Sequence, residues 1–144
     1  MNSDDILKDF GNVVGISDMK LDEKRTCTLL LNENDVILIN EFDMSRLMIS
    51  CVLGELNDSQ TKDNDTTLML LGLNLSFAME NGPSIGYLPE MKTSVISIAT
   101  PINELTPELV QMQITNLIEK KRAILTNLEQ IGLFFKQKTD IEKV

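Results

Sequence analysis

Apolar positions surround a predicted helix over residues 66–80, which has no polar side. Leu68, Leu71, Leu75 and Met79 follow helical spacing on one face. The remaining faces are filled by Met69, Leu70, Leu73 and Phe77. A helix that is apolar all round must be covered on both sides. Since the rest of a 144-residue chain can cover only one side, we expect a second copy to cover the other.

Upstream of this helix, the pattern predicts one helix and three strands. Ile6, Phe10, Val13 and Val14 recur at helical spacing after Ser3, which we take as the capping residue, and Gly15 is a plausible stop. Strand-like runs then follow, separated by short turns. These runs are Thr26–Leu31, Val36–Phe42 and Arg46–Leu53. Short turns between adjacent strands predict an antiparallel meander.

The second half of the chain predicts a surface loop, the apolar helix, two strands and a last helix. The loop covers residues 54–65, and the strands cover residues 84–88 and 93–100. Thr106 and Pro107 have the composition of a helix start. The buried side of the last helix is predicted to consist of Val110, Ile114, Leu117, Ile124, Leu128 and Ile131. This order predicts an α+β fold with one domain over residues 1–136 and a charged tail over residues 137–144.

One face of the predicted sheet and one basic patch have no assigned partner in this order of elements. Residues 36–39 are continuously apolar, so both faces of the sheet are expected to be covered there. The far face could bind an extended peptide or an amphipathic helix, or it could be covered by loops or by the tail. Lys120, Lys121 and Arg122 are interpreted as a solvated helix face, with docking to an acidic partner as the alternative.

The charge balance excludes several classes of partner. The chain has 22 acidic and 13 basic residues, for a net charge of −9. Such a surface repels nucleic acid and anionic membranes. The acidic start and the lack of a long apolar run predict neither a secretory signal nor a membrane span. With Cys27 and Cys51 interpreted as buried, reduced thiols, we expect a cytoplasmic protein.

The residues that most chemistry requires are missing. There is no histidine, and the seven glycines are scattered rather than gathered in a phosphate-binding loop. Two separated cysteines do not make a zinc site. Asp58, Asp63 and Asp65 lie in one loop, but their spacing does not match a calcium-binding EF-hand. We therefore expect no enzyme activity, no cofactor and no metal.

Four short segments resemble one known family. Residues 21–29 (Leu-Asp-Glu-Lys-Arg-Thr-Cys-Thr-Leu) are similar to the family's entry into its first strand, and Leu53-Gly54 resembles the end of its third. Residues 70–75 (Leu-Leu-Gly-Leu-Asn-Leu) are similar to its Leu-Leu-x-x-Asn helix, and residues 81–87 to the following turn and strand. The chain thus resembles the class I type III secretion chaperones of the Tir-chaperone (CesT-like) family over residues 3–130.

The resemblance implies a secretion-chaperone-like homodimer in the bacterial cytoplasm. Such proteins bind the N-terminal segment of a secreted effector in an extended state, without ATP, with the secretion ATPase as a further candidate partner. The resemblance places the dimer contact on Leu70, Leu71, Leu73, Asn74, Leu75 and Phe77. It places effector contacts on Ile6, Phe10, Leu30, Ile37, Ile39, Met48 and Val95.

Three alternatives remain open at this point. The chain could be a secretion regulator or half of a heterodimeric chaperone with the same fold. It could be a structural dimer that binds no peptide. It could also be a small-ligand-binding α/β domain, for which a closed apolar cavity is expected.

Overall fold

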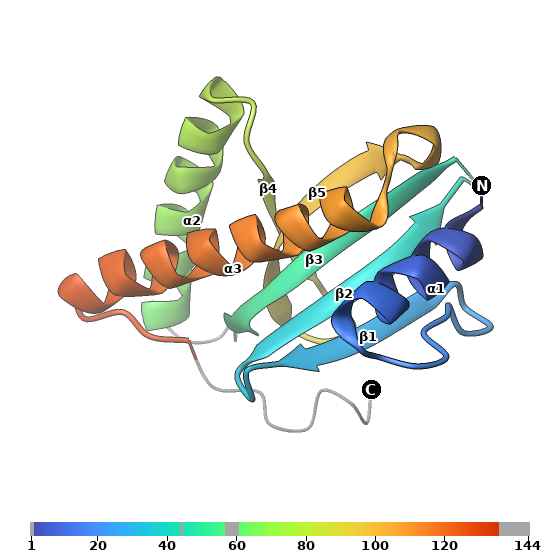
Figure 1. The fold of residues 1–144 in the computed structure, drawn as a ribbon. Coiled ribbons are helices and arrows are strands. Elements are labelled where there is room, and N and C mark those ends of the chain that lie inside the picture. The colour runs from blue at the N-terminus through green and yellow to red at the C-terminus, as the bar shows by residue number, and fades with distance from the viewer. Residues whose placement is uncertain (1, 44, 57–60, 136–144) are drawn as a thin grey trace.

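A computed structural model of the chain describes residues 2–43, 45–56 and 61–135. The elements follow the predicted order of helix, three strands, helix, two strands and helix (Figure 1). Their bounds are α1 (Ser3–Val14), β1 (Thr26–Leu31), β2 (Asp35–Phe42), β3 (Arg46–Glu55), α2 (Thr61–Met79), β4 (Ser84–Leu88), β5 (Thr93–Pro101), a short 3₁₀ helix η1 (Ile102–Glu104) and α3 (Pro107–Gln130). The predicted α+β fold is confirmed.

The five strands form one antiparallel sheet in the order β1-β2-β3-β5-β4. Helices α1 and α3 cross one face of this sheet, whereas α2 stands away from it beside β4 (Figure 1). The first and last helices therefore cover the same face of the sheet. Strands β1 and β4 are the two edges of the sheet.

Helix ends agree with the sequence signals, with two corrections. The N-cap of α1 is Asn2 rather than Ser3: Asn2 forms a reciprocal capping box with Asp5, and Ser3 is buried in the first turn. Gly15 ends this helix in the left-handed conformation, with φ of 82°. Helix α2 starts at Thr61, five residues before the predicted start. Its first turn was assigned to the loop because it is polar.

The main core lies between the sheet and the α1–α3 layer. Its fully buried side chains come from α1, the central strands and α3, and include Ile6, Leu7, Ile37, Ile39, Leu47, Ile49, Ile96 and Leu117. A smaller cluster occupies the opposite face and consists of Val36, Leu38, Val52 and Val95, with Leu88 and Met91 packed against it. Both faces of β2 are therefore covered, as its unbroken apolar run predicted.

The chain returns to the sheet after α3. Ile131, which was predicted to lie on the buried side of α3, follows the end of the helix and is 55% exposed. The prediction is wrong because the helix ends at Gln130. Phe135 is buried against Gly54 of β3, where a Cβ atom would lie only 2.3 Å from that of Phe135. A glycine is needed at this point because the returning segment packs directly on the strand. The predicted tail, residues 137–144, lies outside the described residues.

Candidate functional site: two apolar surfaces

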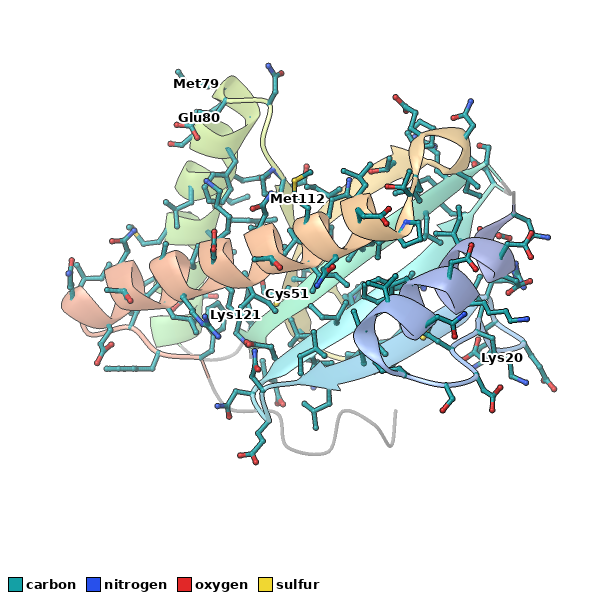
Figure 2. The ribbon with its side chains drawn as sticks, in the orientation of Figure 1. Lys20, Cys51, Met79, Glu80, Met112 and Lys121 are labelled. Atoms are coloured by element: carbon teal, nitrogen blue, oxygen red, sulfur yellow. The ribbon has the colours of Figure 1, made fainter. Side chains whose placement is uncertain are left out.

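Helix α2 carries two opposed apolar stripes. The inner stripe packs against the rest of the protomer and consists of Thr66, Leu70, Leu73, Asn74 and Phe77. The outer stripe consists of Leu68, Leu71, Leu75 and Met79, which are 67%, 60%, 66% and 79% exposed. The outer stripe ends at Met79, far from the sheet (Figure 2). Four large apolar side chains in one row are too much exposed surface for an isolated soluble chain.

The six predicted dimer contacts divide between these stripes. Leu71 and Leu75 lie on the outer stripe, while Leu70, Leu73, Asn74 and Phe77 lie on the inner one. Both stripes are apolar, so spacing alone could not tell which one packs inside the protomer. The four inner residues pack against other residues of their own protomer.

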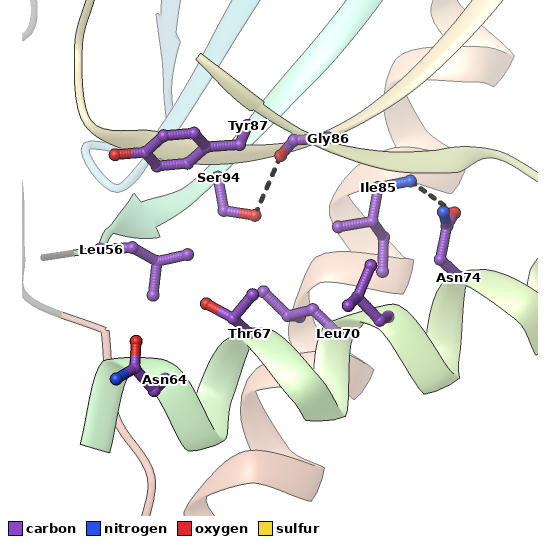
Figure 3. Close-up of a pocket in the computed structure, with 10 residues that line it drawn as sticks. Leu56, Asn64, Thr67, Leu70, Asn74, Ile85, Gly86, Tyr87 and Ser94 are labelled. Atoms are coloured by element: carbon purple, nitrogen blue, oxygen red, sulfur yellow. Dashed lines mark hydrogen bonds between the residues drawn. The ribbon is translucent and has the colours of Figure 1, made fainter. Parts of the chain in front are cut away.

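Asn74 has a visible structural role. Its side-chain oxygen accepts a hydrogen bond of 2.8 Å from the backbone N–H of Ile85, the second residue of β4 (Figure 3). This bond fixes α2 against the edge of the sheet. It also satisfies a backbone donor that an edge strand would otherwise leave open.

A pocket of about 350 Å³ lies between α2 and β4 (Figure 3). Its walls are mainly apolar and include Leu70, Leu71, Ile85 and Tyr87. Leu71 belongs both to this wall and to the outer stripe, and Tyr87 is 46% exposed. The pocket and the outer stripe therefore form one continuous apolar surface, open to solvent in the protomer.

The predicted effector contacts lie in three different environments. Ile6, Phe10, Ile37 and Ile39 are core residues, each at most 3% exposed, because α1 packs directly on β2. Val95 belongs to the smaller cluster on the other face. Met48 is half-buried and Leu30 is 62% exposed. Of these seven side chains, only Leu30 and Met48 offer surface to a partner in this protomer.

Leu30 lies on β1, whose outer edge pairs with no strand among the residues that the structure describes. The backbone N–H of Glu41 donates to the carbonyl of Arg25, so Arg25 and the alternate residues after it face β2. The backbone groups of Thr26, Thr28 and Leu30 therefore point away from the sheet. An open edge of this kind can accept an extended peptide as a further strand.

The basic triplet on α3 is held by contacts within the protomer. The Lys121 ammonium group lies 3.2 Å from the Asp35 carboxylate and donates to the carbonyl of Asn34 at 3.0 Å. Arg122 reaches the same carboxylate at 3.4 Å, and Lys120 lies over the ring of Phe77. The side chains of Lys121 and Asp35 are only 10% and 5% exposed. Interpreting all three residues as a solvated face was therefore wrong for Lys121. Lys121 follows Leu117 by four residues on the buried side, a spacing that could have identified it.

The two cysteines are free thiols. Burial raises the pKa of Cys51 to about 11, and burial also raises the pKa of the half-buried Cys27. Both shifts make the reactive thiolate less available. Among the residues that the structure describes, no cluster of acidic or cysteine side chains could hold a metal ion. Asp58, one of the three acidic residues of the predicted loop, lies outside the described residues.

Comparison with known proteins identifies the family. The model of the Tir chaperone protein (CesT) family matches residues 5–125. The chain belongs to this family. The Tir chaperone of Escherichia coli O157:H7 is 24% identical over 128 residues, spanning 89% of this chain and 80% of that protein. The Tir chaperone of Citrobacter freundii is 23% identical over the same shares of both chains.

Solved structures share the fold of this CesT-family chain. The HopA1–SchA chaperone–effector complex contains a chain with a TM-score of 0.68 and 18% identity, covering 83% of this chain and 89% of that one. The ExsC–ExsE complex gives a TM-score of 0.68 at 16% identity, covering 84% and 92%. Within the described part of the chain, no helix is long and apolar enough to cross a membrane.

Proposed function

We propose that this chain is a type III secretion chaperone that acts as a homodimer in the bacterial cytoplasm. It binds the N-terminal segment of a secreted effector in an extended state, keeps that segment soluble without hydrolysing ATP, and delivers it for export. The observation that carries this proposal is the family match over residues 5–125. The similar HopA1–SchA structure is itself a chaperone–effector complex, and the two surfaces described above suit both halves of the proposal.

The outer stripe of α2 and the adjoining pocket form the dimer contact. In a two-fold symmetric dimer, the same patch is used by both copies. The stripe of one copy is then the natural cover for the stripe and pocket of the other. Of the six predicted dimer contacts, this assignment retains Leu71 and Leu75. It adds Leu68, Met79 and Tyr87, all of which are exposed.

The open edge of β1 is the proposed place where an effector segment binds. A strand added there gains backbone hydrogen bonds with the chaperone, and its alternate side chains fall on the two faces of the sheet. Leu30 offers an exposed apolar neighbour on one face, and the half-buried Leu29 and Leu31 offer neighbours on the other. Since backbone groups make the hydrogen bonds, such a site accepts many sequences. That property suits a segment that must stay unfolded for export.

The test is co-purification of the tagged full-length chain from its native host, with mass spectrometry of the bound protein and light scattering for the mass of the complex. We expect one or a few secreted proteins, each bound through its N-terminal region to two copies of the chaperone. Recovery should not change when ATP is depleted. A clean dimer that carries no protein would refute the chaperone role, and one carrying a small molecule in the α2–β4 pocket would replace it with ligand binding.

A matched pair of variants tests the binding edge. Leu30 on β1 and Met112 on α3 are 62% and 54% exposed, so neither contributes much to the core. Leu30→Asp should reduce the amount of effector recovered, because it places a charge beside the added strand. Met112→Asp should not. Equal recovery with both variants would remove β1 from the proposal while leaving the chaperone role intact.

A further inference from the structure

The edge of β1 is only partly open, because a side chain occupies its first position. The carboxylate oxygen Oδ1 of Asp22 accepts a hydrogen bond of 2.9 Å from the backbone N–H of Thr26. The backbone N–H of Asp22 donates in turn to the carbonyl of Thr26 at 2.8 Å. Both outward backbone groups of Thr26 are therefore already paired. Asp22 makes the contacts that a neighbouring strand would otherwise make.

A local turn holds this carboxylate in place. The same Oδ1 atom of Asp22 accepts from the N–H of Lys24 at 2.9 Å, and the Asp22 carbonyl accepts from the N–H of Arg25 at 3.0 Å. Arg25 adopts a left-handed backbone with φ of 60° and forms ion pairs with Asp4 and Glu41, on α1 and β2. We call the pairing of Asp22 with the backbone of Thr26 the Asp22 cap. It is built into the turn that leads into β1, and Arg25 anchors that turn to α1 and β2.

Thr28 and Leu30, the next two residues of β1 whose backbone groups point outward, differ from Thr26. Within the described residues, the outward N–H and C=O groups of Thr28 and Leu30 have no hydrogen-bond partner, and both residues are exposed. The strand ends one residue after Leu30. The usable edge therefore has four backbone groups, two from each residue, bounded by Asp22 at one end and by the β1–β2 turn at the other.

We infer that Asp22 is a positioning residue that sets where an effector strand can begin on β1, by excluding Thr26 and leaving only Thr28 and Leu30 to pair. This inference rests on the strand addition proposed above. An incoming segment then needs only about four or five extended residues. In the added strand, the side chain of the residue that pairs with Leu30 lies on the same face of the sheet as the exposed Leu30 side chain. An apolar residue is therefore favoured at that position of the effector. The Asp22 cap thus specifies both the length of the effector segment and its register on β1.

Residue-resolved amide exchange on the full-length chain tests this inference. In the free protein, the amide of Thr26 should exchange more slowly than those of Thr28 and Leu30. The bound state uses the protease-resistant N-terminal fragment of the effector recovered by co-purification. On binding, the amides of Thr28 and Leu30 should slow by at least about fivefold, as expected for one net hydrogen bond each. The amide of Thr26 should not change.

Two variants of the cap separate positioning from folding. Asp22→Asn keeps the acceptor oxygen and should reproduce the wild-type exchange pattern. Asp22→Ala removes it but keeps the backbone N–H of residue 22 on the Thr26 carbonyl, so only the Thr26 N–H is freed. That amide should exchange about fivefold faster in the free protein and become protected on binding, when the added strand supplies an acceptor for it. The far-ultraviolet circular dichroism of both variants should match that of the wild type.

Three results would overturn the inference. They are fast exchange of Thr26 in the free wild type, unchanged Thr28 and Leu30 amides in a complex that does form, and an Asp22→Ala pattern identical to that of the wild type. Each of these leaves the chaperone role standing. Failure to recover any effector would instead refute the proposed function, and in that case the free-state comparison of Thr26 with Thr28 still decides whether the cap exists.

Discussion

Truncation of Leu75 on the outer stripe of α2 should weaken self-association without unfolding the protomer. Leu75 is 66% exposed, so it contributes little to the protomer core and would contribute mainly to a dimer. Full burial of a leucine is worth about 1.5–3 kcal/mol, and burying two-thirds of one is worth about 1–2 kcal/mol. In a two-fold dimer the change occurs twice, so Leu75→Ala should cost about 2–4 kcal/mol of dimer stability.

This cost corresponds to a rise in the dimer dissociation constant of between about 30-fold and about 1,000-fold. Sedimentation velocity over a range of protein concentrations measures it directly. Met112→Ala is the matched control, because Met112 is similarly exposed but lies on α3 rather than on α2. Leu70→Ala is the opposite control. Leu70 is 4% exposed on the inner stripe, so its truncation should lower the free energy of unfolding by about 2–5 kcal/mol.

A Leu75→Ala dimer that dissociates no more readily than the Met112→Ala dimer would remove the outer stripe from the dimer contact. An equal fall in melting temperature for Leu75→Ala and Leu70→Ala would show that the two stripes are equally buried in the protomer. Leu73, another residue of the predicted dimer contact, is less informative as a test position. It packs against the core of its own protomer, so a charge there would disrupt folding as well as assembly.

Three further changes probe the protomer. Gly54→Ala should lower the free energy of unfolding by about 1–3 kcal/mol because the new Cβ meets the Cβ of Phe135; in thermal unfolding the loss should shrink in a Phe135→Gly background, which removes that Cβ, and an equal loss in both backgrounds would contradict the contact. Lys121→Met should cost at most about 3 kcal/mol in urea unfolding, because it removes one cation from the buried carboxylate of Asp35 and leaves Arg122 beside it; an unchanged midpoint would show that the Lys121–Asp35 ion pair adds no stability. Cys51, with its pKa raised to about 11, should resist iodoacetamide at pH 8 until urea is added, and rapid native labelling seen by mass spectrometry would contradict its burial.

The sequence was sufficient to predict the order of elements, because periods of two and of three to four residues differ clearly in this chain. It was insufficient to assign surfaces wherever both sides of an element are apolar. Leu70 and Leu71 are adjacent and chemically identical, yet one is buried in the protomer and the other exposed. Ile37 and Val36 are separated in the same way, on the two faces of β2. Only the positions of the neighbouring elements decide such cases.

The roles of Asp22 and Asn74 were hidden for a different reason. Both residues lie in segments that the resemblance had singled out, but a cap depends on which backbone groups an edge strand leaves open. That in turn depends on strand order: β4 is an edge because β5 inserts between β3 and β4, and β1 is an edge because, in the described part of the chain, β2 is the strand that pairs with it. The contribution of each residue therefore follows from topology rather than from local pattern.

The packing of α1 against α3 has a consequence for synthesis of the chain. Ile6 and Phe10 are buried in a cluster that also contains Leu117, more than 100 residues later. Strand β3 likewise needs β5, which lies on the far side of α2 in the sequence. Contacts between such distant residues form slowly. The sheet cannot close before β5 has left the ribosome, and its helical cover cannot close before α3 has, so the apolar faces of the earlier elements stay exposed until then.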